Sequence, residues 1–158
     1  MRNPNSRRYP ERPYVGVGAL VFDSESENPR VLLVERGTEP LKGWWSLPGG
    51  VLETGERLAD GVRREAREET GLEVDPYELF EVFERILPDA RGRAEFHYVL
   101  IDYLCRPIGG ELAASSDASR AAWIARGDLG RYHITDGTLA VIEKAFDRVS
   151  RDHASFQL

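Results

Sequence analysis

The 158-residue sequence has one cysteine, one methionine, three histidines and no long apolar run. A single cysteine excludes an intramolecular disulfide, so a reducing compartment, the cytoplasm, is the expected location. Cys105 ends the apolar run Tyr98–Cys105, where a packed thiol is expected rather than a nucleophile. Without a second histidine at ligand spacing, zinc is not expected. No segment approaches the ~20 apolar residues that span a bilayer, and residues 1–12 lack the apolar core of a signal peptide.

The sequence also lacks an excess of positive charge. Its net charge is −6 and its isoelectric point is about 5.2. Stable binding to nucleic acid or to an anionic membrane needs a basic surface, so neither partner is expected. An acidic protein that handles phosphates must reverse the sign of its field locally, which bound divalent cations do. A small-molecule partner is therefore expected, while a monomer and a homodimer both remain open.

Apolar periodicity and turn residues predict an N-terminal arm over residues 1–12 and one domain over residues 13–158, with no internal repeat and no linker. Strands interleaved with two helices predict an α/β fold with a mixed sheet. The expected strands are Tyr14–Phe22, Arg30–Glu35, Glu78–Leu87, Ala94–Cys105 and Ala121–Ala125; the expected helices are Glu56–Thr70 and Asp136–Ser150; the expected long loops are Gly37–Gly50 and Pro107–Ser119.

The most informative segment is the acidic helix that Gly71 is expected to end. Glu65, Glu68 and Glu69 stand at i, i+3 and i+4, so their side chains share one helix face. Like charges at this spacing repel one another, and a fold gains nothing from them unless a positive charge lies on them. Carboxylate oxygens are natural ligands of Mg²⁺. A solvated acidic face is the alternative for such a cluster considered alone.

The surroundings of the cluster decide between these readings. Gly50 is followed after five residues by Glu56, and after seven more by Arg64-Glu65-Ala66-Arg67-Glu68-Glu69-Thr70-Gly71-Leu72. This segment resembles the Nudix box at every defined position. The resemblance implies a Nudix-type α/β/α sandwich in which the box forms a loop-helix-loop. Gly61 within the predicted helix is a departure, because a glycine there destabilises a helix by about 1 kcal/mol relative to alanine.

The resemblance also implies roles for the residues of the box. Glu65, Glu68 and Glu69 would hold one or more Mg²⁺ ions, with Mn²⁺ a possible substitute and the Gly50 carbonyl a further ligand. Arg64 would pair with Glu56 and so orient the helix and the preceding loop, since arginine offers a planar fork to a carboxylate. Whether Glu65 instead orients or deprotonates the attacking water is left open.

Other site residues are expected outside the box. In many members of the family the general base comes from a later loop; Asp117 is our first choice here, with Glu111, Asp89 and Glu95 as alternatives. Arg36 is a candidate for a phosphate contact, and Trp44 for stacking on a base. Arg85 and Phe83 are expected to face the cleft, whereas Trp45 is expected to anchor the loop.

The expected activity is that of a Mg²⁺-dependent hydrolase, a Nudix pyrophosphohydrolase that cleaves the pyrophosphate bond of a nucleoside diphosphate derivative. Pro88, sixteen residues beyond the box, favours ADP-ribose by resemblance to family members that act on it, although proline is common in turns. The first alternative is a pyrophosphohydrolase of oxidised deoxynucleoside triphosphates. A catalytically silent nucleotide sensor and an RNA-decapping enzyme are weaker alternatives, because the box is intact and neither a DNA-binding domain nor a basic surface is evident.

Overall fold

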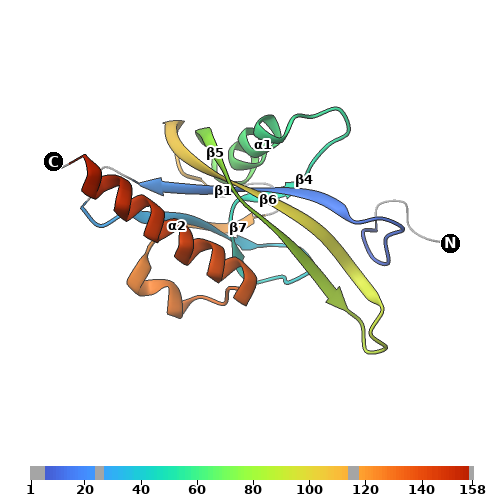
Figure 1. Cartoon of the computed structure of the whole chain (residues 1–158). Helices are drawn as coiled ribbons and strands as arrows, with labels where there is room; N and C mark the ends of the chain where they lie inside the picture. Colours follow the sequence, from blue (N-terminus) through green and yellow to red (C-terminus); the bar gives the residue numbers. More distant parts are fainter. Residues whose placement is uncertain (1–5, 24–26, 114–117, 157–158) are drawn as a thin grey trace.

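The computed structural model describes residues 6–23, 27–113 and 118–156. Seven strands in this part of the chain form a mixed sheet (Figure 1), with the order β3-β2-β1-β6-β5, while β4 pairs with β1 and β7 pairs with β2. The pairing of β1 with β6 is parallel and the other pairings are antiparallel. The elements are β1 (Tyr14–Asp23), β2 (Arg30–Arg36), β3 (Trp45–Ser46), β4 (Gly49–Val51), α1 (Leu58–Thr70), β5 (Leu72–Pro88), β6 (Ala94–Gly110), β7 (Ala118–Ala125), the 3-10 helix η1 (Arg126–Arg131) and α2 (Asp136–Ser155).

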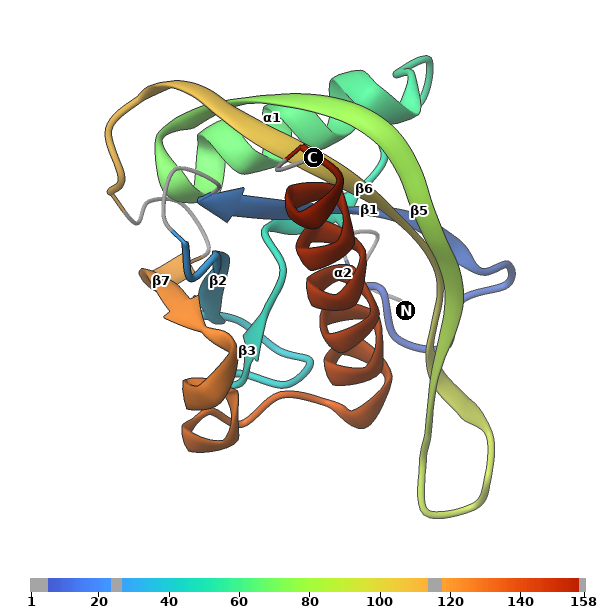
Figure 2. The same ribbon diagram turned by 60° about the vertical axis from the view of Figure 1, so that its left-hand side comes forward.

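The two helices cover opposite faces of the sheet, with α2 in front of the strands and α1 behind them in Figure 2. Strand side chains alternate between faces, and β1 follows this rule. Leu20 packs in the cluster that contains Phe146 of α2, whereas Val21 packs in the cluster that contains Val62 of α1. The core is thus split into two layers, and the expected α/β/α sandwich is confirmed.

Several element boundaries differ from the sequence-based expectation. Helix α1 begins at Leu58 rather than Glu56, because Arg57 has extended backbone angles. Strand β5 begins at Leu72 rather than Glu78: Leu72 and Val74 are buried, and Pro76 is accommodated at a break in the register with β6. The predicted loop Pro107–Ser119 is shorter than expected, since β6 continues to Gly110 and β7 begins at Ala118.

The loop expected over Gly37–Gly50 contains β3 and the start of β4. Helix α2 extends five residues beyond the expected Ser150. Trp45 and Cys105 are buried, as expected for a loop anchor and a packed thiol. Burial raises the pKa of the Cys105 thiol, which keeps it in the unreactive protonated form. Among the described residues, no helix combines the length and apolarity needed to cross a bilayer.

Residues 6–12 contain no helix or strand but are held against the β5–β6 hairpin. The Tyr9 amide donates to the Glu95 carbonyl at 2.7 Å, and the Tyr9 hydroxyl donates to Asp89 Oδ2 at 2.9 Å. Arg8 forms an ion pair with Glu95. These contacts place Arg7 beside the functional site described next.

Candidate active site

The acidic face of α1 is directed away from the core by the packing of the opposite face. Val62 and Ala66 are fully buried against the sheet, and Gly71 ends the helix in the left-handed conformation with φ 75°. The glutamates of the box differ in exposure: the Glu65 side chain is 12% exposed, whereas that of Glu68 is 48% exposed. One helix face therefore presents both a sheltered and a solvated carboxylate.

Arg64 organises this face. Its Nε and Nη2 donate to the Glu56 carboxylate at 2.6 and 2.9 Å, which is the pairing implied by the resemblance. Its Nη1 donates to Glu65 at 2.8 Å and to Glu68 at 3.2 Å, and Nη2 also reaches the Val51 carbonyl at 3.3 Å. The hydrogen bonds that Arg64 donates to Glu56 are the main reason why the pKa of Arg64 is raised. Arg64 thus fixes both the preceding loop and the glutamates.

Two glycines are required by close approaches. A Cβ on Gly50 would lie 2.5 Å from Glu65 Oε1, so only glycine lets this carboxylate rest against β4. A Cβ on Gly61 would lie 2.9 Å from Leu52 Cδ1, 3.0 Å from Glu56 Oε1 and 3.3 Å from a Val17 methyl. The departure at Gly61 therefore has a packing reason, because a larger residue would push α1 off the sheet and off Glu56.

A polar hollow, here called the carboxylate cavity, lies between α1 and the strands. The cavity is lined by carboxylates, one strand arginine and glycine backbone. Its lining includes Glu35, Arg36, Gly49, Gly50, Glu65 and Glu69. Burial, and then the neighbouring Glu65 charge, raise the pKa of Glu69 to about 8. Burial is also the largest cause of the raised pKa of Glu65.

The donor set of the carboxylate cavity fits a divalent cation. Two sheltered carboxylates that resist simultaneous ionisation gain from a positive charge between them, and carboxylate and carbonyl oxygens suit Mg²⁺. Within the described part of the chain, no three acidic, histidine or cysteine side chains form a ready metal cage. Glu68 does not line this cavity, because Arg64 holds its carboxylate to one side. Glu65 and Glu69 are therefore the ligands best placed, and Glu68 would join them by turning from Arg64.

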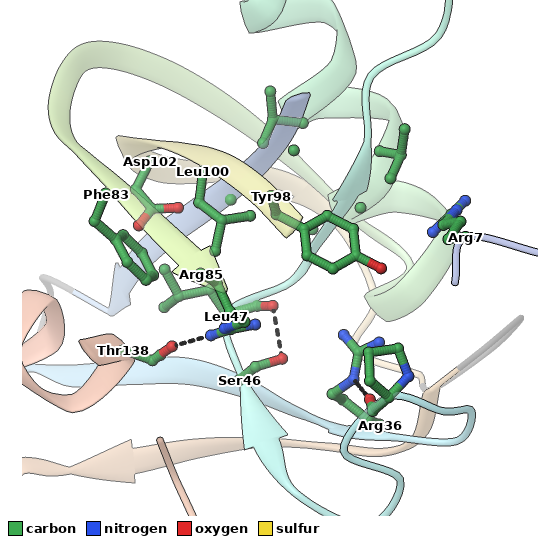
Figure 3. A pocket seen from close by; sticks show the side chains of 17 residues that line it. Arg7, Arg36, Ser46, Leu47, Phe83, Arg85, Tyr98, Leu100, Asp102 and Thr138 are labelled. Carbon is green, nitrogen blue, oxygen red and sulfur yellow. Dashed lines mark hydrogen bonds between the residues drawn. The ribbon is translucent and has the colours of Figure 1, made fainter. Parts of the chain in front are cut away.

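A second hollow, here called the inner cavity, adjoins the first (Figure 3) and encloses about 640 Å³, including space open to solvent. Its walls come mainly from β1, β4, β5 and β6, with Leu47 from between β3 and β4 and Thr138 from α2, and many of the side chains are aliphatic or aromatic. They include Leu47, Phe83, Tyr98 and Leu100, with Arg85, Asp102 and Thr138 as the polar members away from the entrance. Aromatic walls with a few polar groups are typical of a ligand pocket.

The two cavities share a wall formed by Arg7, Arg36, Ser46, Gly49, Gly50 and Val51. Arg36 is oriented by donating from Nε to the Pro40 carbonyl at 2.7 Å. Arg85 donates to Thr138 Oγ1 at 2.6 Å and to Thr135 Oγ1 at 3.3 Å. Burial, and then the charge of Arg36, lower the pKa of Arg85. Two mutually repelling arginines along connected cavities favour an anionic ligand.

Of the site residues predicted outside the box, some line the two cavities and others do not. Arg36, Arg85 and Phe83 line the cavities. Trp44 lines neither; its ring lies beside His133, with ring centroids 5.7 Å apart, and it is 37% exposed. Asp117, the first choice for a general base, lies outside the described residues.

The alternative bases lie away from both cavities. Asp89 accepts hydrogen bonds from Tyr9, Arg93 and two turn amides, and despite burial these lower its pKa to about 2. Glu95 pairs with Arg8, and Glu111 is exposed beyond the end of β6. None of these three lines the carboxylate cavity. Glu35 does, although Arg120 also pairs with it.

Sequence reasoning missed Arg7, Glu35, Tyr98 and Asp102 as lining residues. Asp102 alone carried a signal, because it is the only charged residue in the apolar run Tyr98–Cys105. The other three occupy ordinary strand or arm positions, and their roles depend on distant chain segments.

The chain is thus an α/β protein in which one helix, α1, presents carboxylates beside a ligand pocket, the inner cavity. The chain belongs to the NUDIX domain family, whose model matches residues 12–143. Two structures illustrate the likeness. The NUDIX domain of Shewanella oneidensis NrtR complexed with ADP ribose has a TM-score of 0.73 at 26% identity, over 88% of this chain and 90% of that one. A MutT NUDIX hydrolase from Burkholderia pseudomallei has a TM-score of 0.71 at 30% identity, over 84% and 98%.

Curated relatives include enzymes with two different substrates in their names. The ADP-ribose pyrophosphatase of Methanocaldococcus jannaschii is 38% identical over 69% of this chain and 60% of its own length. The human 8-oxo-dGDP phosphatase NUDT18 is 36% identical over 66% of this chain and 31% of its own length. The chain therefore spans less than two thirds of either relative.

Proposed function

We propose that the protein is a Mg²⁺-dependent pyrophosphohydrolase acting on a nucleoside diphosphate linked to a further group, with ADP-ribose the first candidate. The observation that carries this proposal is the shared wall between the carboxylate cavity and the inner cavity. A diphosphate beside Glu65 and Glu69 would have Arg36 within its surroundings, and one end of the substrate would enter the inner cavity. A relative named ADP-ribose pyrophosphatase and a similar NUDIX domain solved in complex with ADP ribose support the choice of substrate.

The reaction adds water across one phosphoanhydride bond. The water oxygen bonds to one phosphorus, the bridging bond breaks, and each product carries a phosphate; ADP-ribose would give AMP and ribose 5-phosphate. Mg²⁺ held by Glu65 and Glu69 would neutralise the diphosphate oxygens and lower the pKa of bound water. Mn²⁺ has similar oxygen preferences and is the expected substitute.

The protein's own part in this reaction is positioning. Arg64 holds Glu65 against Gly50, so this carboxylate is set before substrate arrives. Arg36 and Arg7 would counter phosphate charge at the junction of the cavities. The proton of the attacking water needs an acceptor, and Glu35 and Asp117 are the candidates that we would test first. Glu35 is favoured by lining the carboxylate cavity.

A second candidate substrate is an oxidised guanine nucleotide, favoured by the relative named 8-oxo-dGDP phosphatase. The same chemistry would release 8-oxo-dGMP and orthophosphate from 8-oxo-dGDP. The two candidate substrates differ in the group that would occupy the inner cavity and in the second product, which is ribose 5-phosphate for ADP-ribose and orthophosphate for 8-oxo-dGDP.

The test is product analysis with Mg²⁺ and a panel containing ADP-ribose, 8-oxo-dGDP, oxidised and ordinary deoxynucleoside triphosphates, and nucleotide sugars. Glu69→Gln is the inactive variant, and Glu73→Gln is its matched control, because Glu73 lies on the surface paired with Arg67. AMP and ribose 5-phosphate formed by the wild type and the control, but not by Glu69→Gln, would support the first candidate. Nucleotide binding without any turnover would overturn the proposal in favour of a sensor.

A further inference from the structure

Asp102 is a buried acid on the central strand β6. In the sheet it is paired with Gly18 of β1 on one side and with Glu81 of β5 on the other. The residue is only 3% exposed, and its neighbours Ile101 and Tyr103 in sequence are apolar or aromatic. An acid in this position is unfavourable for folding unless its carboxyl is hydrogen-bonded.

That requirement is not met for one oxygen of this carboxyl by any residue that the structure describes. Oδ2 of Asp102 is the one buried side-chain nitrogen or oxygen without a hydrogen-bond partner in the described part of the chain. Burial raises the pKa of Asp102 to about 7, although Arg85 opposes and Glu81 reinforces the change. Unsatisfied buried groups are rare in native proteins and need an explanation.

The backbone of β1 is adapted to this carboxyl. A Cβ on Gly18 would lie 2.2 Å from Oδ1 of Asp102, so any other residue would displace the acid. An unpartnered acid and a glycine that makes room for it thus occur at one place in the sheet. A buried acid without a partner and a glycine inside a strand each destabilise a fold. Their occurrence at the same place in the sheet indicates a binding function rather than a packing role.

The carboxyl belongs to the lining of the inner cavity. In Figure 3 Asp102 and Phe83 lie at the opposite end from Arg7 and Arg36, with Arg85 between them. The cavity therefore runs from an end with Arg7, Arg36 and Tyr98, past Leu100, to an interior that contains Phe83 and the unpartnered acid. A planar heterocycle with N–H groups on its edge matches that interior, since its face suits Phe83 and its N–H suits Asp102.

We propose that Asp102 determines nucleobase specificity by accepting a hydrogen bond from an N–H on the edge of a purine base bound in the inner cavity. An acceptor on the same edge would face the Arg85 guanidinium. Adenine offers its exocyclic amine for this contact, and guanine or oxidised guanine offers N1–H and its amine. The inference rests on the proposed function, because that function places the nucleoside end of the substrate in this cavity.

The experiment measures binding without turnover. α,β-Methylene diphosphates of adenosine, guanosine and purine riboside are titrated calorimetrically into the protein with Mg²⁺, since their P–C–P bridge resists hydrolysis. Purine riboside lacks the exocyclic amine and the ring N–H. The better of the first two analogues should bind about 10- to 100-fold more tightly than the purine riboside analogue, the range expected for a hydrogen bond to a charged group.

The variants assign that preference to Asp102. Asp102→Leu, close in shape but without an acceptor, should reduce the ratio of affinities to near one, and its melting temperature should be no lower than that of the wild type. Asp102→Asn, the more conservative change, should reduce the ratio at least about threefold. Glu84→Gln is the matched control, since it removes an exposed carboxylate from β5, outside the cavity, and it should leave the ratio unchanged.

The result that would overturn the inference is an unchanged ratio in both Asp102 variants, or a wild type that binds all analogues equally or not at all. These outcomes differ from failure of the proposed function. A wild type that discriminates bases but cleaves nothing would refute only the hydrolase, and one that cleaves without discriminating would refute only the role of Asp102.

Discussion

The carboxylate cavity and the inner cavity share a wall but are built in different ways. In the first, Glu65 and Glu69 come from one helix and Gly49 and Gly50 from the strand β4 just before it, all within residues 49–69, and β2 adds Glu35 and Arg36. The polar residues of the second come from β5, β6 and α2, where Arg85, Asp102 and Thr138 are up to 53 positions apart. A site built within one helix is set by helical periodicity, whereas one built across a sheet is set by strand register.

Because of this difference, we expect the carboxylate cavity to carry the reaction and the inner cavity to determine which nucleotide is bound. The carboxylate cavity has little freedom to vary, because Arg64 contacts both Glu56 and Glu65, and Glu65 rests against Gly50. The inner cavity can change one lining residue at a time without disturbing α1. We therefore expect substitutions in the first cavity to abolish turnover and substitutions in the second to change which nucleotide is used.

The largest expected effect is on catalysis. Glu69→Gln removes a carboxylate from the carboxylate cavity while keeping its size, and kcat/KM should fall on the order of 10²- to 10³-fold, as for other loss of charge stabilisation. Steady-state hydrolysis at saturating Mg²⁺ checks this. Glu73→Gln should stay within a factor of two, and equal losses in both variants would contradict the assignment.

The next effect concerns stability and pH. The folded-state pKa of Asp102 is about 7, above its ordinary value of 3.8, so the native state keeps a proton that the unfolded chain has lost. Stability should therefore fall as pH rises from about 4 to about 7 and level off above that. The charged groups facing Asp102 are Arg85 and Glu81.

Asp102→Asn should lack this decline. The free energy of unfolding of the variant relative to wild type should increase between pH 4 and pH 7, by at most roughly 4 kcal/mol. Urea unfolding at a series of pH values measures the difference. Parallel pH profiles for the two proteins would mean that Asp102 ionises normally and is not buried as described.

A third prediction concerns the ion pairs before and within α1. Arg64→Ala leaves Glu56 and Glu65 without their main partner, and because the Arg64 side chain is only 20% exposed, the loss should be about 2–3 kcal/mol. Arg67→Ala, which breaks the exposed pair with Glu73, should cost less than about 0.5 kcal/mol. Chemical denaturation compares them, and equal losses would contradict the organising role of Arg64.

The smallest effect tests the fit of Asp102 against β1. Gly18→Ala places a Cβ 2.2 Å from Oδ1 of Asp102, and overpacking should lower stability by roughly 1–2 kcal/mol. In an Asp102→Ala background most of this loss should disappear, because the colliding atoms are gone. A double-mutant cycle by urea unfolding measures the coupling, and additive losses would show that the close approach is not the cause.

Much of the fold, and the glutamates of the carboxylate cavity, could be predicted from the sequence. Helical spacing predicts that Glu65, Glu68 and Glu69 share one face of α1, the resemblance to the box implies the Arg64–Glu56 pair, and strands interleaved with helices predict the mixed sheet. The length of β5 could not be predicted, because Glu73, Asp75 and Pro76 conceal the buried Leu72 and Val74. The place of Trp44 also could not, since it depends on the approach of His133.

The inner cavity depends on the register between β1, β6 and β5, which no single segment encodes. Asp102 stood out only as an acid in an apolar run, and its meaning requires Gly18 beside it and Arg85 in the same cavity. Arg7 could not be assigned, because the arm reaches the site through contacts of Tyr9 and Arg8 with residues of the β5–β6 hairpin.

The most direct test of this account is a crystal structure of the protein with Mg²⁺ and the α,β-methylene analogue of ADP-ribose. We predict electron density for a metal ion between Glu65, Glu69 and the bridged phosphates, with the adenine in the inner cavity and its amine within hydrogen-bond distance of Asp102. Diphosphate density away from Glu65 and Glu69, or an adenine stacked outside on Trp44 with the inner cavity holding only solvent, would contradict it.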